Sequence, residues 1–143
     1  MKVKIINKSK NKLPDYATNN SAGMDLRAFL DKEEIISSKE TKIINTGIFI
    51  EIPFGYEAQI RPRSGLAFKN QITVLNSPGT IDSDYRGEVK VILINLSKKD
   101  FVIRNGDRIA QMVISKYEKI TWRKTETLKQ SDRTGGFGST GIK

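Results

Sequence analysis

The chain has 143 residues, with no cysteine and no histidine, and this length fits one domain with a real hydrophobic core. The composition excludes disulfides, a Ser-His triad, a Cys-His nucleophile and a conventional zinc site. Any enzymatic chemistry would therefore fall to carboxylates, hydroxyls, basic groups and an oxygen-binding metal such as magnesium.

The net charge of +9 is mainly a feature of the N-terminus. Residues 2–12 hold five lysines and no acid, and removing these five charges from +9 leaves +4 for the rest of the chain. We interpret the lysines as a solvated strand edge, where lysine discourages pairing with other strands. The sequence shows no run of about 18 apolar residues and no secretory signal. Because the chain has no cysteine, we expect a reducing, cytoplasmic setting.

Short runs of alternating apolar and polar residues recur along the chain. They predict strands over residues 2–6, 23–29, 41–44, 47–52, 56–61, 72–75, 88–95, 101–103 and 108–115. No stretch keeps a helical period, and glycine, proline, asparagine and aspartate punctuate the runs, which indicates an all-β sandwich or barrel. We expect one domain over residues 1–128, followed by a flexible tail over residues 129–143.

Asp25 lies in the segment SAGMDLRA, residues 21–28, on a predicted strand that is otherwise apolar on the side of Gly23. A carboxylate in this place either pairs with an arginine or holds waters around a metal. The sequence leaves both alternatives open.

The segment RPRSGLAF, residues 61–68, has the ingredients of an anion site. Pro62 favours an extended approach, Ser64 suits the N-cap of a helix, and residues 66–69 can form one helical turn. The free amides after Ser64 and the guanidinium of Arg63 would then face a phosphate. A capped turn with solvent-facing arginines is the equal alternative.

Residues 75–95 contain two turn signals, near 76–79 and 84–87, and then an apolar run at 89–94 that predicts a buried strand. Asp82, Asp84 and Tyr85 lie at the tip of this β scaffold, an arrangement typical of a binding site. The alternative is an ordinary hairpin whose acidic residues cap backbone amides.

Two later segments add candidates. In GDRIAQMV, residues 106–113, strand alternation places Gln111 on the same apolar face as Ile109 and Val113. Its side-chain amide therefore needs a hydrogen-bond partner there, either a backbone group or a ligand oxygen. In GGFGSTG, residues 135–141, the lone Phe137 favours a segment that folds over a ligand, although such glycine-rich tails are usually disordered linkers.

Together, the segments SAGMDLRA, RPRSGLA, NSPGTIDSDYRGE, GDRIAQ and GGFGSTG resemble the five motifs of the trimeric dUTPase family (deoxyuridine 5'-triphosphate nucleotidohydrolases), in the family's order. The resemblance implies a jelly-roll-like (β-clip) barrel with at most one short helix, and a flexible C-terminal arm that closes over the active site. It also implies a homotrimer with shared active sites.

The activity that this resemblance implies is hydrolysis of dUTP to dUMP and pyrophosphate, by in-line attack of water on the α-phosphorus. Magnesium would be required and would be bound mainly through the substrate triphosphate. The reaction would keep uracil out of DNA and supply dUMP for thymidylate synthesis.

The resemblance further implies roles for individual residues. Asp82 would orient and deprotonate the attacking water, Tyr85 would pack on the deoxyribose and exclude a 2′-hydroxyl, and Phe137 would stack on uracil. Other uracil and deoxyribose contacts would come from Asn76, Thr80, Ile81 and Lys90. Phosphate contacts would come from Arg63, Ser64, Gly65, Gln111, Arg133, Gly138, Ser139 and Thr140. Asp25 would approach the magnesium through water only.

One departure concerns the arm. The family usually reads Arg-Gly-x-Gly-Gly-Phe-Gly there, whereas this chain is one residue shorter between Arg133 and Phe137. Arg133 would therefore have to reach the γ-phosphate over a shorter connection.

Two other functions are alternatives. The dCTP deaminases are similar to dUTPases in architecture, but the hairpin at residues 82–87 and the glycine-rich arm favour the dUTPase. A basic β-barrel that binds single-stranded nucleic acid would need aromatics along one strand face, and here they are scattered. We therefore expect no specific nucleic-acid partner and no membrane partner.

Overall fold

The computed structural model describes residues 1–132 and 135–136, and their regular structure is almost entirely β. The strands are β1 (Lys4–Asn7), β2 (Met24–Arg27), β3 (Glu34–Ile36), β4 (Thr41–Ile44), β5 (Ile48–Glu51), β6 (Tyr56–Arg61), β7 (Ile72–Val74), β8 (Gly79–Ile81), β9 (Val91–Asn95), β10 (Phe101–Ile103) and β11 (Arg108–Lys116). A short helix, α1 (Ser64–Asn70), follows β6. No helix in these two ranges is long and apolar enough to cross a membrane.

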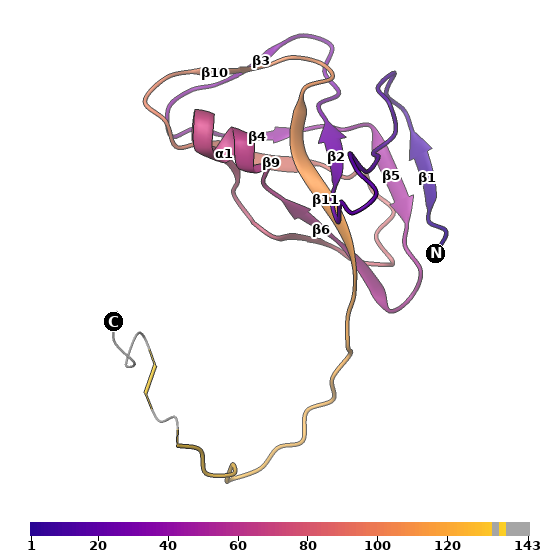
Figure 1. Cartoon of the computed structure of the whole chain (residues 1–143), viewed down its shortest axis with the longest axis vertical. Coiled ribbons are helices and arrows are strands. Elements are labelled where there is room, and N and C mark those ends of the chain that lie inside the picture. Colours follow the sequence, from indigo (N-terminus) through magenta and orange to yellow (C-terminus); the bar gives the residue numbers. More distant parts are fainter. Residues whose placement is uncertain (133–134, 137–143) are drawn as a thin grey trace.

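The strands form four small antiparallel sheets (Figure 1). The largest has the order β2-β11-β6-β8, the next β4-β9-β7, and two ribbons pair β1 with β5 and β10 with β3. The predicted jelly-roll-like all-β fold with one short helix is confirmed. The predicted barrel is not closed within the described ranges, because the strands divide among separate sheets.

The core lies between these sheets and follows from strand alternation. On β6, Ala58 and Ile60 point inward, as their predicted parity requires. The predicted buried strand at 89–94 is present as β9, in which Val91 and Leu93 are buried and Ile92 and Ile94 are half-buried. The buried apolar side chains are Leu26, Ala28, Ile36, Ile44, Ile48, Ile50, Ile52, Ala58, Ile60, Ile72, Val74, Val89, Val91, Leu93, Ile103, Ile109, Ala110 and Met112.

The N-terminal lysines lie on the strand edge that their spacing indicates. β1 pairs with β5 alone, and the side chains of Lys2, Lys4 and Lys8 are exposed. Lys4 Nζ lies 2.9 Å from Glu51 Oε1 across the ribbon, and Lys8 Nζ lies 4.6 Å from the centre of the Phe49 ring. The excess positive charge is thus exposed to solvent along one edge of the fold.

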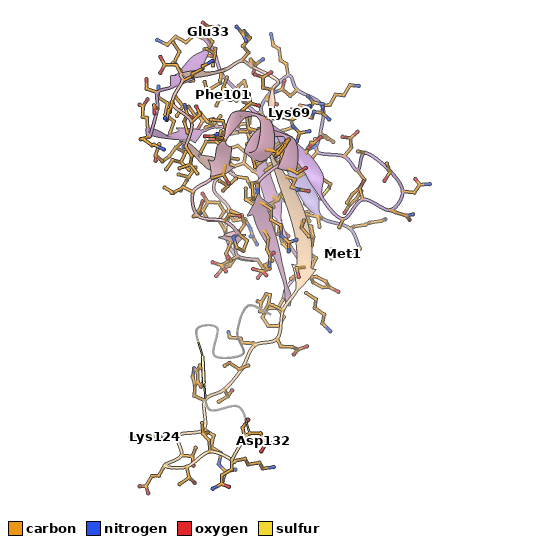
Figure 2. The ribbon with its side chains drawn as sticks, turned by 60° about the vertical axis from the view of Figure 1, so that its left-hand side comes forward. Met1, Glu33, Lys69, Phe101, Lys124 and Asp132 are labelled. Carbon is orange, nitrogen blue, oxygen red and sulfur yellow. The ribbon has the colours of Figure 1, made fainter. Side chains whose placement is uncertain are left out.

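The chain leaves the packed body after β11. Residues 118–132 are exposed and contain neither helix nor strand. Figure 2 shows Lys124 and Asp132 well outside the body that holds Lys69 and Phe101. The packed part of the described chain therefore ends near residue 117.

Asn95 is a fully buried polar residue that ties three segments together. Its Nδ2 donates to the carbonyl oxygens of Ile36, at 2.8 Å, and Lys99, at 2.7 Å. Its Oδ1 accepts from the Ser97 amide at 2.9 Å. The side chain therefore joins β9, β3 and the turn before β10.

We expect Asn95→Ala to lower the free energy of unfolding by about 3 kcal/mol, because each buried polar group that loses its partner costs ~1–3 kcal/mol. Urea denaturation followed by circular dichroism measures the change. Asn20→Ala, at an exposed loop position, is the control and should stay within about 0.5 kcal/mol of the wild type. Equal values for the two variants would contradict the role of Asn95.

Candidate active site

A groove of about 440 Å³ lies at one end of the four-stranded sheet. It collects side chains from three segments that the sequence singles out, residues 21–28, 61–68 and 106–113. Its lining residues are Asp15, Ala17, Ser21, Ala22, Gly23, Asp25, Arg61, Arg63, Ser64, Gly65, Arg108, Gln111 and Val113. The fold thus brings these distant segments to one place.

Asp25 lies between two arginines in the lining of this groove. Its Oδ1 accepts from Arg63 Nε at 2.8 Å and its Oδ2 accepts from Arg108 NH1 at 3.1 Å. Arg63 NH1 also donates to the carbonyl oxygen of Arg108 at 3.3 Å. Of the two roles left open for Asp25, the structure shows the arginine pairing. One carboxylate orders two guanidinium groups, which leaves an excess of positive charge for an anion.

Gln111 lines the same groove as Val113, which has the same strand parity. The pairing of β11 with β2 shifts between Arg108 and Ala110, and both Ile109 and Ala110 are buried at this bulge. Gln111 Nε2 donates to the Pro62 carbonyl at 2.9 Å, so a backbone group is its partner.

Gly23 leaves the space that Gln111 occupies. A Cβ built on Gly23 would overlap Gln111 Oε1 and lie 3.1 Å from its Cδ. The amide of Gln111 is therefore held between the backbone at Pro62 and the bare backbone at Gly23, which directs it into the groove.

Ser64 is the first helical residue of α1 rather than its predicted N-cap. Arg63 occupies the N-cap, without a side-chain cap hydrogen bond, and its Nε donates to Asp25. Ser64 and Gly65 remain exposed at the rim of the groove.

Arg108 is a further residue of this groove, and its sequence pattern alone does not mark it as one. It lies at the first position of β11, where it reaches Asp25 on the neighbouring β2. The signal lay in GDRIAQ, where a cation directly precedes an apolar strand. Only the pairing of β11 with β2 shows that this cation faces the same carboxylate as Arg63.

A second groove, of about 640 Å³, contains Asp82. It is lined by Phe54, Glu57, Asp82, Ser83, Asp84, Tyr117, Glu118, Lys119 and Ile120. Asp82 is exposed and directly follows β8. The Tyr85 amide donates to the Asp82 carbonyl at 3.1 Å, and Arg86 NH1 donates to the Ser83 carbonyl at 2.7 Å. The predicted second turn is therefore present, and it fixes the backbone that carries Asp82.

The remaining candidates near Asp82 lie along one continuous segment. Asn76 is exposed in the turn between β7 and β8, packed over Gly79. Thr80 is exposed on β8 and Ile81 is half-buried beside it. Lys90 Nζ lies 3.9 Å from a Glu88 carboxylate oxygen.

The two grooves do not meet within one chain. We call the groove lined by Arg61, Arg63 and Arg108 the arginine groove, and the groove that contains Asp82 the Asp82 groove. β6 borders both, because Glu57 near its start lines the Asp82 groove and Arg61 at its end lines the arginine groove. These positions are four residue steps apart, which is about 13 Å along a strand. One copy therefore does not place the Asp82 carboxylate beside Arg63 and Gln111. Arg133, Phe137, Gly138, Ser139 and Thr140 lie outside the described residues.

Within residues 1–132 and 135–136, no three acidic side chains come together as a cluster that could hold a metal ion. A metal at the arginine groove would therefore depend on a ligand for most of its coordination.

Comparison with known proteins places this geometry in a family. A model of the dUTPase family matches residues 9–141. The chain is 62% identical over 143 residues to the deoxyuridine 5'-triphosphate nucleotidohydrolase of Rickettsia bellii, covering 99% of this chain and 95% of the relative. It is 56% identical to the enzyme of that name from Finegoldia magna, covering 99% of each.

Solved structures show a similar fold. The chain resembles the dUTPase of Staphylococcus bacteriophage 80alpha, solved with dUPNHPP, with a TM-score of 0.89, 23% identity and coverage of 99% of each chain. It also resembles a mutant dUTPase from phage phi11 of S. aureus, described with a structural Mg(II) ion. That TM-score is 0.81, at 20% identity, covering 91% of this chain and 100% of the other.

Proposed function

Because the chain belongs to the dUTPase family, we propose that it is a dUTP diphosphatase, which hydrolyses dUTP to dUMP and pyrophosphate with magnesium. The observation that carries this proposal is the arginine groove, where Asp25 orders Arg63 and Arg108 beside Gln111. We propose a cytoplasmic setting, since a chain without cysteine needs no oxidising compartment. There the reaction would remove a source of uracil in DNA and supply dUMP for thymidylate synthesis.

The arginine groove is suited to the triphosphate. Arg63 and Arg108 carry more positive charge than Asp25 neutralises, and guanidinium groups match phosphate oxygens in geometry. The exposed Ser64 and Gly65 add a hydroxyl and amides at the rim, and Gln111 adds its side-chain amide. These groups would hold the phosphates in the orientation that in-line attack requires.

The Asp82 turn is suited to activate water and to bind the nucleoside. An aspartate carboxylate is ionised at neutral pH and can take a proton from a bound water. Tyr85, three residues later, would pack on the deoxyribose. We propose that Asn76, Thr80, Ile81 and Lys90, which lie on the same segment, contact the uracil and the sugar.

The separation of the two grooves supports sites shared between copies. Since Asp82 and Arg63 lie at different ends of the sheet, one copy would supply the base and another the phosphate groove. We propose a homotrimer with such shared sites. The tail, with residues 129–143 as the closing arm, would add Phe137 over the uracil. Arg133, Gly138, Ser139 and Thr140 would meet the phosphates.

The residues present fit a magnesium ion that arrives with the triphosphate. Two acidic residues, Asp15 and Asp25, line the arginine groove, and both carboxylate oxygens of Asp25 accept from arginines. Magnesium keeps several waters and binds phosphate oxygens readily, so Asp25 would approach it only through water. The ion, when bound, would neutralise charge on the triphosphate.

We expect Asp25→Asn to raise the KM for dUTP by about tenfold, because losing the carboxylate charge frees two guanidinium groups whose charge-assisted hydrogen bonds are worth ~1.5–3 kcal/mol each. Steady-state kinetics measure the change. Asp100→Asn removes the same charge from an exposed turn and should leave KM within about twofold. An unchanged KM in Asp25→Asn would contradict the ordering role.

Pyrophosphate release from dUTP, dCTP and UTP, with and without magnesium, tests the function. We expect release from dUTP with magnesium to exceed release from the other two nucleotides and to fall when a chelator is added. Ammonia release from dCTP would show a deaminase instead, and no release from dUTP would contradict the proposal.

A further inference from the structure

The ring of Tyr85 is held in place, although 43% of the residue is exposed. Tyr85 Oη donates to the Glu88 carbonyl at 3.1 Å, which folds the ring back over Gly87. A Cβ built on Gly87 would lie 2.5 Å from Tyr85 Cζ and 3.0 Å from Cε2. The backbone of Gly87 does not have a positive φ, so the ring, rather than the backbone, excludes a side chain there.

The carbonyl that receives Tyr85 is itself fixed by the Glu88 side chain. Glu88 Oε1 accepts from the amides of Thr46, at 3.1 Å, and Gly47, at 2.7 Å. Only 16% of this side chain is exposed. The Glu88 carboxylate therefore links the segment that follows the Asp82 turn to the turn between β4 and β5.

Two further contacts join that turn to the hairpin. The Val89 amide donates to the Ile48 carbonyl at 2.8 Å, and the hydroxyl of the buried Thr46 donates to the Val89 carbonyl. Gly47 has a φ of +71°, and a Cβ there would lie 2.8 Å from the Ser9 amide nitrogen. The turn therefore has little freedom to move, and neither does the backbone at Glu88.

We infer that Glu88 and Gly87 are positioning residues for Tyr85, and that they set the discrimination between deoxyribonucleotides and ribonucleotides. This inference deepens the proposed function and rests on it. A ring that hung freely from the hairpin would change rotamer and admit a 2′-hydroxyl. With its hydroxyl bound to the Glu88 carbonyl and its hydroxyl end against Gly87, the ring would stay where it meets the sugar.

The expected loss of selectivity is limited, because an apolar surface rejects an added hydroxyl only weakly. Such a surface favours a ligand without the hydroxyl over one with it by only about 10². A small displacement of the Tyr85 ring therefore removes much of the selectivity for dUTP over UTP. The discrimination ratio, kcat/KM for dUTP over kcat/KM for UTP, is therefore the informative readout. A role of Glu88 confined to stability would change the melting temperature and leave this ratio unchanged.

The experiment measures this ratio and the melting temperature in the wild type, Glu88→Ala and Gly87→Ala. We expect both variants to lower the ratio by about tenfold. Glu51→Ala is the control, because it removes an exposed glutamate of the neighbouring β5 that pairs with Lys4. Its ratio should stay within about twofold of the wild type.

Tyr85→Phe keeps the test decisive if an alanine variant does not fold, because it removes only the hydroxyl that Glu88 accepts. We expect its ratio to fall several-fold. Ratios within twofold of the wild type in the folded variants would overturn the inference alone, since dUTP would still be hydrolysed. A wild type that does not hydrolyse dUTP would overturn the proposed function and the inference with it.

Discussion

Asp82→Asn is expected to lower kcat for dUTP by ~10²–10⁴, the range that a positioned general base contributes, while dUTP binding stays within a few-fold of the wild type. The carboxylate lies exposed at the end of β8, and the backbone of its turn is fixed by Tyr85 and Arg86. Asparagine has nearly the same shape but cannot take a proton from water. The substitution therefore removes the base and leaves the turn in place.

Single-turnover kinetics and titration with a non-hydrolysable dUTP analogue separate the two effects. Asp84→Asn is the matched control, since Asp84 is exposed in the same turn and lines the same groove. Its kcat should remain within about threefold of the wild type. A kcat near the wild-type value in Asp82→Asn would show that Asp82 is not the base.

Removing residues 133–143 is expected to lower kcat by at least ~10², because the arm would close the site and complete its phosphate contacts. The fold should survive, since the buried core described here ends at Met112 and residues 118–132 are already exposed. Thermal unfolding and light scattering report on fold and assembly, and pyrophosphate release reports on kcat.

A chain that lacks only residues 142–143 is the control for this truncation, because it keeps every residue proposed to contact dUTP. We expect its kcat to match the wild type. If the longer truncation unfolded the protein, the tail would be structural. If kcat were unchanged, the closing arm would have no part in the reaction.

The strands were predictable where alternation is strong. Residues 41–44 and 101–103 form strands with the predicted bounds, and the face of β6 that carries Ala58 and Ile60 is buried as expected. β3 (Glu34–Ile36) and β8 (Gly79–Ile81) were not predicted. Their pairing with β10 and β6 is a tertiary effect that local sequence does not reveal.

The candidate site was predictable in its residue types but not in its arrangement. The sequence marked Asp25, Arg63 and Gln111, yet only the sheet brings Asp25 to both arginines. The pairing of β11 with β2 shifts between Arg108 and Ala110, and no residue pattern marks that shift. Arg108 was not predicted as a site residue, because its role depends on its ion pair with Asp25 on the neighbouring β2.

The separation of Asp82 from the arginine groove was also beyond the sequence. The motifs imply active sites shared between copies, but they do not say which residues one copy would supply. The register of β8 on β6 places Asp82 beside Glu57, while the arginines gather at the other end of β6. Strand register therefore adds which of the predicted residues lie apart within one copy.

Mixed oligomers of Asp82→Asn and Arg63→Ala chains test the central claim most directly, namely that one copy supplies the base and another supplies the phosphate groove. Each variant alone should release little pyrophosphate from dUTP. After co-expression in equal amounts, we predict recovery to about a quarter of the wild-type rate, because random mixing leaves about one shared site in four intact. A mixture as inactive as the separate variants, measured on oligomers shown to contain both chains, would contradict the account.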